Sequence, residues 1–417
     1  MKKVLLLDWS YSYRFYVKEL LKEDCRDFYV VAPEYIADFE AITDYLIISE
    51  LYESNYIEKN INEIISFVNK NKINSLFNTE DELVLLENRL KEKLGLKNCQ
   101  SVVETLQNKH LVRKILEGNL KIKSPKFSCI EARSRDELVN KLKANISFPS
   151  IIKPLSSNFS SGVSLVESYK DIENAVEAVV LEVEDANSYD ILVEDVISLN
   201  GQLISVETFV QNGKLKCVLF TDENQYLHIR NNGSKTFYYD NIFVQSTCSK
   251  VDREIMLEMV KEIIGVFKVS DLTLHIEFKL DNSGIWHLVE INPRLGGGPI
   301  AYSHYLSTGI NPVLLSFKIS NDITLELSDT TKKFNRNANI KFFNKGLKAG
   351  RINKISIDSS KAINYLDKII FYFQEGEYYN YSPTGIGFSI VSGDYNEVQL
   401  YKISNTVKES IEVTFIE

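Results

Sequence analysis

The segment 273–298 holds the residues of this sequence that are best suited to chemistry. It reads TLHIEFKLDNSGIWHLVEINPRLGGG. The stretch 273–280 alternates polar with apolar side chains, the stretch 285–291 is mainly apolar, and the two flank the turn-forming residues 281–284. This pattern is typical of two short strands joined by a tight turn, so it predicts a β-hairpin.

The hairpin would bring two acidic side chains together. Glu277 and Glu290 each lie in an apolar strand, and a hairpin can set them side by side on one face, where they repel each other unless a cation lies between them. Asn292 adds an amide oxygen on the same face, and oxygen ligands of this kind suit Mg²⁺ bound together with nucleotide phosphates. His275 and His287 are interpreted as sheet-face residues, because imidazole suits Mg²⁺ less well. The alternative is an exposed hairpin with two solvated glutamates.

The residues after the hairpin predict a ligand-facing corner. Arg294 presents a fixed fork of N–H donors to a phosphate or carboxylate. Three glycines follow, and they let the backbone approach a ligand closely. Arg294 is therefore a candidate catalytic residue, and Arg294, Gly297 and Gly298 are candidate substrate-binding residues.

A second group of candidates lies upstream. Lys153 ends the apolar strand predicted at 148–152, where a charge is costly unless it is paired. The small-residue loop 155–163 could wrap phosphates with its N–H and hydroxyl groups, although a serine-rich surface turn explains it equally well. The candidate nucleotide ligands here are Lys153, Ser160, Ser161, Gly162 and Val163, and Lys153 is also a candidate catalytic residue. Glu194, Asp195 and Val196 end a further strand, where a nucleotide base could pair with the backbone.

Composition limits the class of protein that positions these residues. A chain of 417 residues is long enough for two or three domains. Its net charge of −9 argues against a nucleic-acid partner. Five cysteines without a C-x-x-C pair fit a reduced, cytoplasmic chain, and no apolar run is long enough for a membrane span.

The order of elements predicts an α/β fold. Alternating strands and helices occupy residues 1–120, without the G-x-G-x-x-G sequence of a dinucleotide site after the first strand. Ser10 and Ser12 are interpreted as caps of the helix that follows that strand. Hairpin strands are predicted around residues 212–213, and the C-terminal region is predicted to alternate short strands with one helix at 360–373.

Together these residues resemble the ATP-grasp superfamily, and more narrowly its carboxylate–amine ligases such as the bacterial L-amino acid (dipeptide) ligases. The resemblance covers most of the chain. It implies that Lys109, four residues before Arg113, and Lys153 contact the nucleotide phosphates, that residues 155–163 cover these phosphates, and that residues 194–196 form the adenine-binding hinge. Glu277, Glu290 and Asn292 fall on the metal ligands of the family.

The resemblance also implies the domain organisation. We expect a Rossmann-like N-terminal (pre-ATP-grasp) domain at 1–120 and a two-lobed ATP-grasp core at 121–328. The small lobe would cover about 121–195 and the large lobe about 196–328. A small C-terminal α+β domain at 329–417 would pack on the core.

The implied reaction joins a carboxylate, activated by ATP as an acyl phosphate, to an amine, and it releases ADP and phosphate. The expected cofactors are ATP and two Mg²⁺ ions, with Mn²⁺ as a substitute, and a homodimer is a possible assembly. Glu80, His228 and Asp240 are further candidate substrate residues, whereas Phe243 replaces a histidine that such ligases often carry. The alternatives are a ligase that loads a carrier protein or another acceptor, and a non-catalytic ATP-binding regulatory protein.

Overall fold

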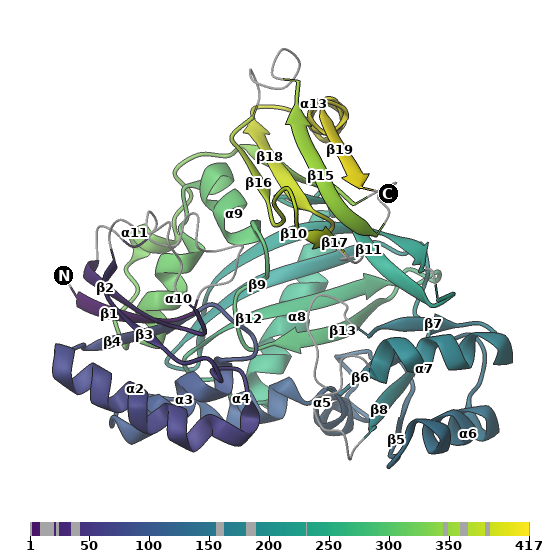
Figure 1. The fold of residues 1–417 in the computed structure, drawn as a ribbon, viewed down its shortest axis with the longest axis horizontal. Coiled ribbons are helices and arrows are strands. Elements are labelled where there is room, and N and C mark those ends of the chain that lie inside the picture. The colour runs from purple at the N-terminus through teal and green to yellow at the C-terminus, as the bar shows by residue number, and fades with distance from the viewer. Residues whose placement is uncertain are drawn as a thin grey trace.

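The N-terminal region forms a parallel sheet covered by helices. The computed structural model describes residues 2–8, 21, 25–34, 42–155, 162–180, 189–230, 232–344, 349–358, 366–379 and 384–416. The first sheet has the order β3-β2-β1-β4 and is parallel throughout. Its elements are β1 (Lys2–Leu7), β2 (Cys25–Ala32), β3 (Ile42–Ile47), η1 (Ser54–Tyr56), α2 (Ile57–Asn71), β4 (Ser75–Asn78) and α3 (Val84–Lys93). Figure 1 shows α2 and α3 beneath these strands. The N-terminal α/β prediction is confirmed, while Ser10 and Ser12 lie outside the described residues.

Two short helices lead into a small antiparallel lobe. These helices are α4 (Gln100–Gln107) and α5 (Lys109–Leu116), and the side chain of Asn108 caps the start of α5. The lobe contains β5 (Phe127–Ile130), α6 (Arg135–Asn145), β6 (Ser150–Pro154), β7 (Ser164–Val166), η2 (Tyr169–Asp171), α7 (Ile172–Val180) and β8 (Ile191–Asp195). Its strands follow the order β7-β6-β8-β5, and α6 and α7 pack on them through one apolar cluster.

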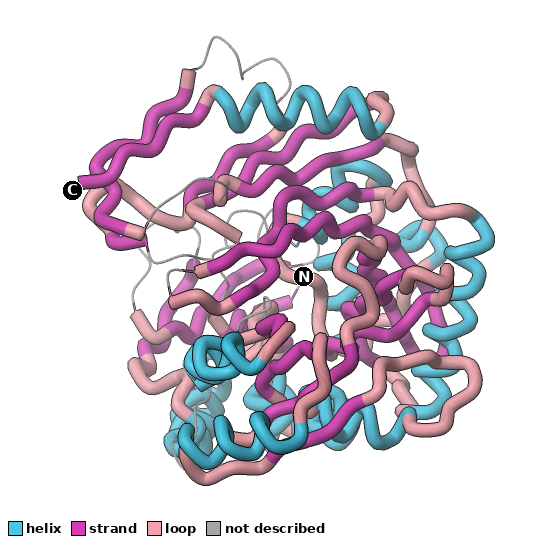
Figure 2. The backbone as a smooth tube through the Cα atoms, turned by 90° about the vertical axis from the view of Figure 1, so that its right-hand side faces the viewer, coloured by secondary structure: helices cyan, strands magenta, loops and turns pink. Residues whose placement is uncertain are grey.

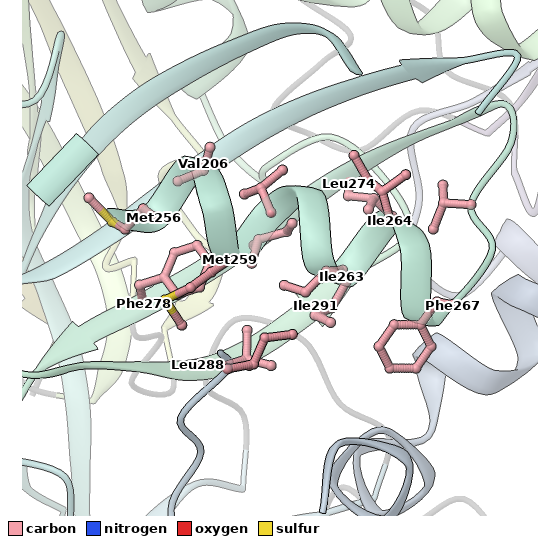
Figure 3. Close-up of a cluster of buried hydrophobic side chains, with 14 of the residues drawn as sticks. Val206, Met256, Met259, Ile263, Ile264, Phe267, Leu274, Phe278, Leu288 and Ile291 are labelled. Carbon is pink, nitrogen blue, oxygen red and sulfur yellow. The ribbon is translucent and has the colours of Figure 1, made fainter. Parts of the chain in front are cut away.

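The large lobe is an antiparallel sheet with one apolar and one polar face. It consists of β9 (Leu203–Gln211), β10 (Lys214–Ile229), β11 (Lys235–Val244), α8 (Lys250–Val266), β12 (Leu272–Leu280) and β13 (Trp286–Asn292), in the strand order β13-β12-β9-β10-β11. Both predicted hairpins are confirmed. Figure 3 shows Met259 and Ile263 of α8 packed against Leu274 and Phe278 of β12. Because strand side chains alternate between faces, the neighbouring polar residues lie on the opposite face.

The C-terminal region continues the same sheet and adds a separate three-stranded sheet of the order β17-β15-β19. Its elements are α9 (Ile300–Thr308), α10 (Pro312–Ser320), α11 (Leu327–Thr330), β14 (Asn337–Phe342), β15 (Gly350–Ile357), β16 (Lys368–Phe371), β17 (Tyr378–Tyr379), β18 (Gly387–Gly393), α13 (Glu397–Glu409) and β19 (Ile411–Ile416). Strand β14 pairs with β11, and β18 pairs with β14. The C-terminal strands lie at the top of the molecule in both Figure 1 and Figure 2.

The predicted helix at 360–373 is wrong over its described part. Lys368–Phe371 form β16, which pairs antiparallel with β18, and residues 359–365 lie outside the described residues. The apolar run here is a buried strand, which periodicity alone does not distinguish from a buried helix. The helix α13 was not predicted, although Asn396 and Gln399 form a capping box at its start.

Helix α10 anchors the N-terminal sheet to the core. Phe317 contacts Phe77 edge to face, and the side-chain amide of Asn321 bonds both the N–H and the carbonyl of Leu76. These contacts fix the segment after β4 next to the large lobe. No described helix is both long and apolar enough to cross a membrane.

Candidate active site

The two predicted glutamates face each other across the β12–β13 hairpin. Glu277 and Glu290 are direct register partners, and a bulge follows Glu277. Asn292 donates from its Nδ2 to Glu290 Oε1 at 2.8 Å. The Nζ of Lys109, at the start of α5, lies 3.8 Å from Glu290 Oε2. The spatial pairing expected from the hairpin is therefore confirmed.

The electrostatics of this pair are unequal. Burial and then the charge of Glu290 raise the pKa of Glu277. Burial would also raise the pKa of Glu290, but the charge of Lys109 and the hydrogen bond from Asn292 hold that pKa at about 2. Glu290 therefore ionises more readily than Glu277. The donor set fits Mg²⁺, because a divalent cation would offset both negative charges and these ligands offer oxygen atoms.

A buried ion triad joins the two lobes. Glu194, on β8, accepts from Lys153 Nζ on β6 at 2.7 Å and from Arg113 Nε on α5 at 2.6 Å. Arg113 also donates to the carbonyl of Val289 on β13. Burial alone would raise the pKa of Glu194, but the charges of Arg113 and Lys153 lower it. The triad therefore holds Lys153 at the end of its strand, next to the glutamate pair.

A cleft opens between the lobes, and its volume is about 790 Å³ when the open space at its mouth is included. Among the predicted residues, its lining includes Lys153, Val163, Glu194, Asp195, Val196, Glu277 and Glu290. Gly162 adopts a left-handed backbone with φ 69°, whereas Ser160 and Ser161 lie outside the described residues. The cleft brings together residues that are up to 137 positions apart in sequence, from Lys153 to Glu290.

Sequence reasoning missed one cation in this cleft. Lys279 follows Glu277 by two positions on β12, and its Nζ lies 5.3 Å from the ring centroid of Phe237. Burial lowers the pKa of Lys279. Among the residues that the structure describes, no carboxylate lies within ion-pair distance of this lysine, in contrast to Lys153. The strand alternation that places Glu277 in the cleft also predicts the direction of Lys279, so the signal was present in the sequence.

A second pocket of about 480 Å³ shares the glutamate pair with the cleft. Its lining includes Glu277, Glu290, Arg294, Gly297 and Gly298, as well as Glu223, His275 and Thr384. Arg294 forms an ion pair with Asp81 at 3.1 Å and donates to the carbonyl of Leu295. The glutamate pair thus lies at the boundary between two hollows, of which one reaches Lys153 and the other reaches Arg294.

A buried carboxylate supports the floor of the second pocket. Glu207 Oε1 lies 2.5 Å from His275 Nδ1, and Glu207 Oε2 accepts from the N–H of Gly296 at 2.8 Å. Burial alone would lower the pKa of His275, but the charge of Glu207 raises it well above its ordinary value. A Cβ on residue 296 would lie 2.5 Å from Glu207 Oε1, which explains the glycine there. His275 was expected to be only a sheet-face residue, yet it lies beside Glu277.

The three remaining candidate substrate residues have other contacts in this structure. Asp240 binds Lys341 Nζ with both of its carboxylate oxygens at 2.9 Å. His228 stacks on Tyr238 at 4.4 Å between ring centroids. Glu80 accepts from the hydroxyl of Thr79, while the neighbouring Asp81 pairs with Arg294. Their roles in substrate binding stay predictions.

Comparisons with known proteins agree with this geometry. Residues 146–302 match the family model of the ATP-grasp domain. The D-alanine–D-alanine ligase of Flavobacterium psychrophilum is 28% identical over 183 residues, which are 43% of this chain and 52% of that protein. The match therefore spans about half the length of this curated relative.

Solved structures extend the likeness of fold to the whole chain. The L-amino acid ligase of Bacillus licheniformis is 17% identical with a TM-score of 0.80, and the alignment covers 100% of this chain and 99% of that one. The phosphoribosylglycinamide synthetase of Anaerococcus prevotii is 13% identical with a TM-score of 0.70, and all of both chains is covered. The match to the ATP-grasp domain at 146–302 thus lies in a chain whose whole fold is similar to these two solved structures.

Proposed function

We propose that the protein is an ADP-forming ligase that activates a carboxylate with ATP and joins it to an amine. The observation that carries the proposal is the in-register pair Glu277 and Glu290, which borders both the cleft with Lys153 and the pocket with Arg294. A nucleotide in the cleft and an organic substrate in the pocket would meet at this pair. The names of the ligases that the chain resembles support the same reaction class.

The cleft would hold ATP with its base at the hinge 194–196 and its phosphates near the lysines. Lys109, Lys153 and Lys279 would offset the phosphate charges. Such electrostatic stabilisation, together with positioning of the reactants, is the main contribution of a protein to phosphoryl transfer. Glu277, Glu290 and Asn292 would hold Mg²⁺, which would neutralise charge on the phosphates during the transfer. The number of ions, and whether Mn²⁺ replaces Mg²⁺, stay predictions.

The second pocket would orient the carboxylate substrate. A carboxylate oxygen attacks the γ-phosphate of ATP, the bond to ADP breaks, and an acyl phosphate forms. The amine then attacks the acyl carbon and phosphate leaves, so an amide, ADP and phosphate are the products. Arg294 would stabilise the negative charge of the acyl phosphate and of the tetrahedral intermediate through its guanidinium.

We propose an amino acid as the carboxylate substrate, on the strength of the likeness to amino acid ligases. Nothing in the comparisons supports a carrier protein as the acceptor. The domain division at about 120 and 328 is part of the same proposal. The pairing of β14 with β11 would connect the C-terminal domain to the large lobe.

The experiment is a release assay with ATP and Mg²⁺ over the twenty amino acids, alone and in pairs. We expect at least one pair to stimulate formation of ADP and of an amide product detected by mass spectrometry. Glu290→Ala should abolish this stimulated release. The matched control is Glu258→Ala, which alters an exposed glutamate of α8 and should leave the rate unchanged. Undiminished turnover in Glu290→Ala would refute the assignment of Glu290.

A further inference from the structure

Three side chains in the second pocket converge on one point beside the glutamate pair. Glu223 on β10, His275 on β12 and Glu277 on β12 each offer one ligand atom, and these atoms all lie within 4.8 Å of one another. His275 Nε2 is 3.3 Å from Glu277 Oε1 and 3.9 Å from Glu223 Oε1. Donors bound to one metal ion at about 2.0–2.2 Å lie about 3–3.5 Å apart. The cluster is therefore close to the spacing of a filled metal site.

Sheet topology explains how donors from separate strands meet. Strand β9 lies between β10 and β12, and it places Ser205 directly opposite Glu277. On the other side of β9, Ser205 pairs with Thr221 of β10, two residues before Glu223. The result is a recess on the polar face of the sheet, lined by Glu223, His275 and Glu277.

Glu223 is the observation that points to a ligand. It is only 4% exposed, and among the described residues the one neutral donor close to its carboxylate is the hydroxyl of Ser205, which does not reach Oε1 in hydrogen-bond geometry. Leaving a buried carboxylate oxygen without a donor is costly, and the atom in question is the one that faces His275.

His275 is oriented as a metal ligand would be. Its Nδ1 faces Glu207 Oε1 at 2.5 Å, and Glu207 is itself fixed by the N–H of Gly296. A carboxylate that accepts from Nδ1–H leaves Nε2 as the nitrogen that can bind a metal ion once the ion displaces its proton, and this arrangement recurs behind histidine ligands in metal sites. Here Nε2 is the nitrogen that faces Glu223 and Glu277.

We propose that Glu223, His275 and Glu277 form a second divalent-cation site, which shares Glu277 with the Mg²⁺ ligands but uses neither Glu290 nor Asn292. One imidazole and two carboxylates favour a transition-metal ion such as Zn²⁺, Mn²⁺ or Co²⁺ over Mg²⁺. The site lies in the pocket assigned to the organic substrate. If the ligase function is correct, the ion is placed to bind the substrate carboxylate or amine, and only this last step depends on the proposed function.

The test uses the full chain, purified without metal, and Co²⁺ as the probe in excess Mg²⁺ with no ATP and no amino acid. We expect one equivalent of Co²⁺ to bind by equilibrium dialysis, with visible d–d absorption that reports a protein ligand set. Glu223→Gln and His275→Asn should each weaken Co²⁺ binding at least 10-fold. Glu290→Gln should weaken it much less, because Glu290 is not a ligand of this site.

The outcomes separate the metal site from the enzyme reaction. Absence of Co²⁺ binding to the wild type overturns the site and leaves His275 as an ion-paired imidazolium among the three glutamates. Binding that survives Glu223→Gln but is lost in Glu290→Gln overturns it as well, because the probe then occupies the Mg²⁺ ligands. Circular dichroism of each variant shows that a loss of binding is not a loss of fold. Co²⁺ binding in a chain that releases no ADP would refute the ligase function and keep the metal site.

Discussion

Gly296→Ala should damage the active site without touching any proposed ligand of ATP or Mg²⁺. The added Cβ would lie 2.5 Å from Glu207 Oε1 and 2.6 Å from His275 Nδ1. Both distances are far shorter than ordinary van der Waals contact, and both neighbours are buried. Glu207 must therefore move, and it cannot move far without releasing the N–H of Gly296 or the ring of His275.

The magnitude follows from these two contacts. A hydrogen bond to a charged group contributes about 1.5–3 kcal/mol, and inserting a methyl group into a packed site costs about 1–3 kcal/mol. We expect the free energy of unfolding to fall by about 2–4 kcal/mol. Urea unfolding followed by tryptophan fluorescence, to which the buried Trp286 of β13 contributes, measures this change. The release assay should lose most of its activity, because His275 adjoins Glu277.

The matched control is a second glycine-to-alanine change in the same lobe. Gly265 lies in α8, and a Cβ built there has no atom within 4 Å. Gly265→Ala should therefore raise the free energy of unfolding by about 0.5–1 kcal/mol, because alanine favours the helix, and leave activity unchanged. If Gly296→Ala is as stable and as active as Gly265→Ala, the close packing of Glu207 against residue 296 is wrong.

Three further predictions concern the cleft. Glu194→Gln leaves Arg113 and Lys153 buried without their counter-charge, so the free energy of unfolding should fall by about 3–5 kcal/mol in urea titrations, and a loss under 1 kcal/mol would contradict the triad. The pKa of Glu194 is lowered in the folded chain, so the unfolded chain binds more protons and the wild type should lose stability as the pH falls below the ordinary value of 4.5; a pH series should show a smaller loss in Glu194→Gln. Lys153→Met and Lys279→Met should each weaken ATP binding about 10-fold or more, which corresponds to a loss of about 1.4 kcal/mol or more of binding free energy. Calorimetric titrations measure this affinity, and an unchanged value would show that the lysine does not bind the nucleotide.

Local pattern was enough to predict the hairpin and its carboxylates. The turn 281–284 and the period-two alternation of β12 predict a hairpin that can bring Glu277 and Glu290 together, whereas the bulge after Glu277 that sets it directly opposite Glu290 is seen only in the structure. The same alternation gives His275 and Lys279 the same face as Glu277. Their importance was missed because the sequence does not show what lies across from them.

The C-terminal region shows the opposite case. The apolar stretch that includes Lys368–Phe371 fits either a helix or a strand, and pairing with β18 decides for the strand. Whether this stretch forms a helix or a strand therefore depends on its pairing with β18, which lies about twenty residues later in the chain. A local sequence pattern does not contain that information.

The sequence by itself determined the residue types of the active site, their order, and the faces of the strands that carry them. Only the tertiary structure decided which distant side chains meet: Glu194 with Arg113 and Lys153, Glu207 with Gly296, and Glu223 with His275. The physical reason is that buried charges need partners, and those partners come from whichever elements the packing brings near. Strand periodicity is a local property of the backbone, whereas charge compensation is a property of the whole fold.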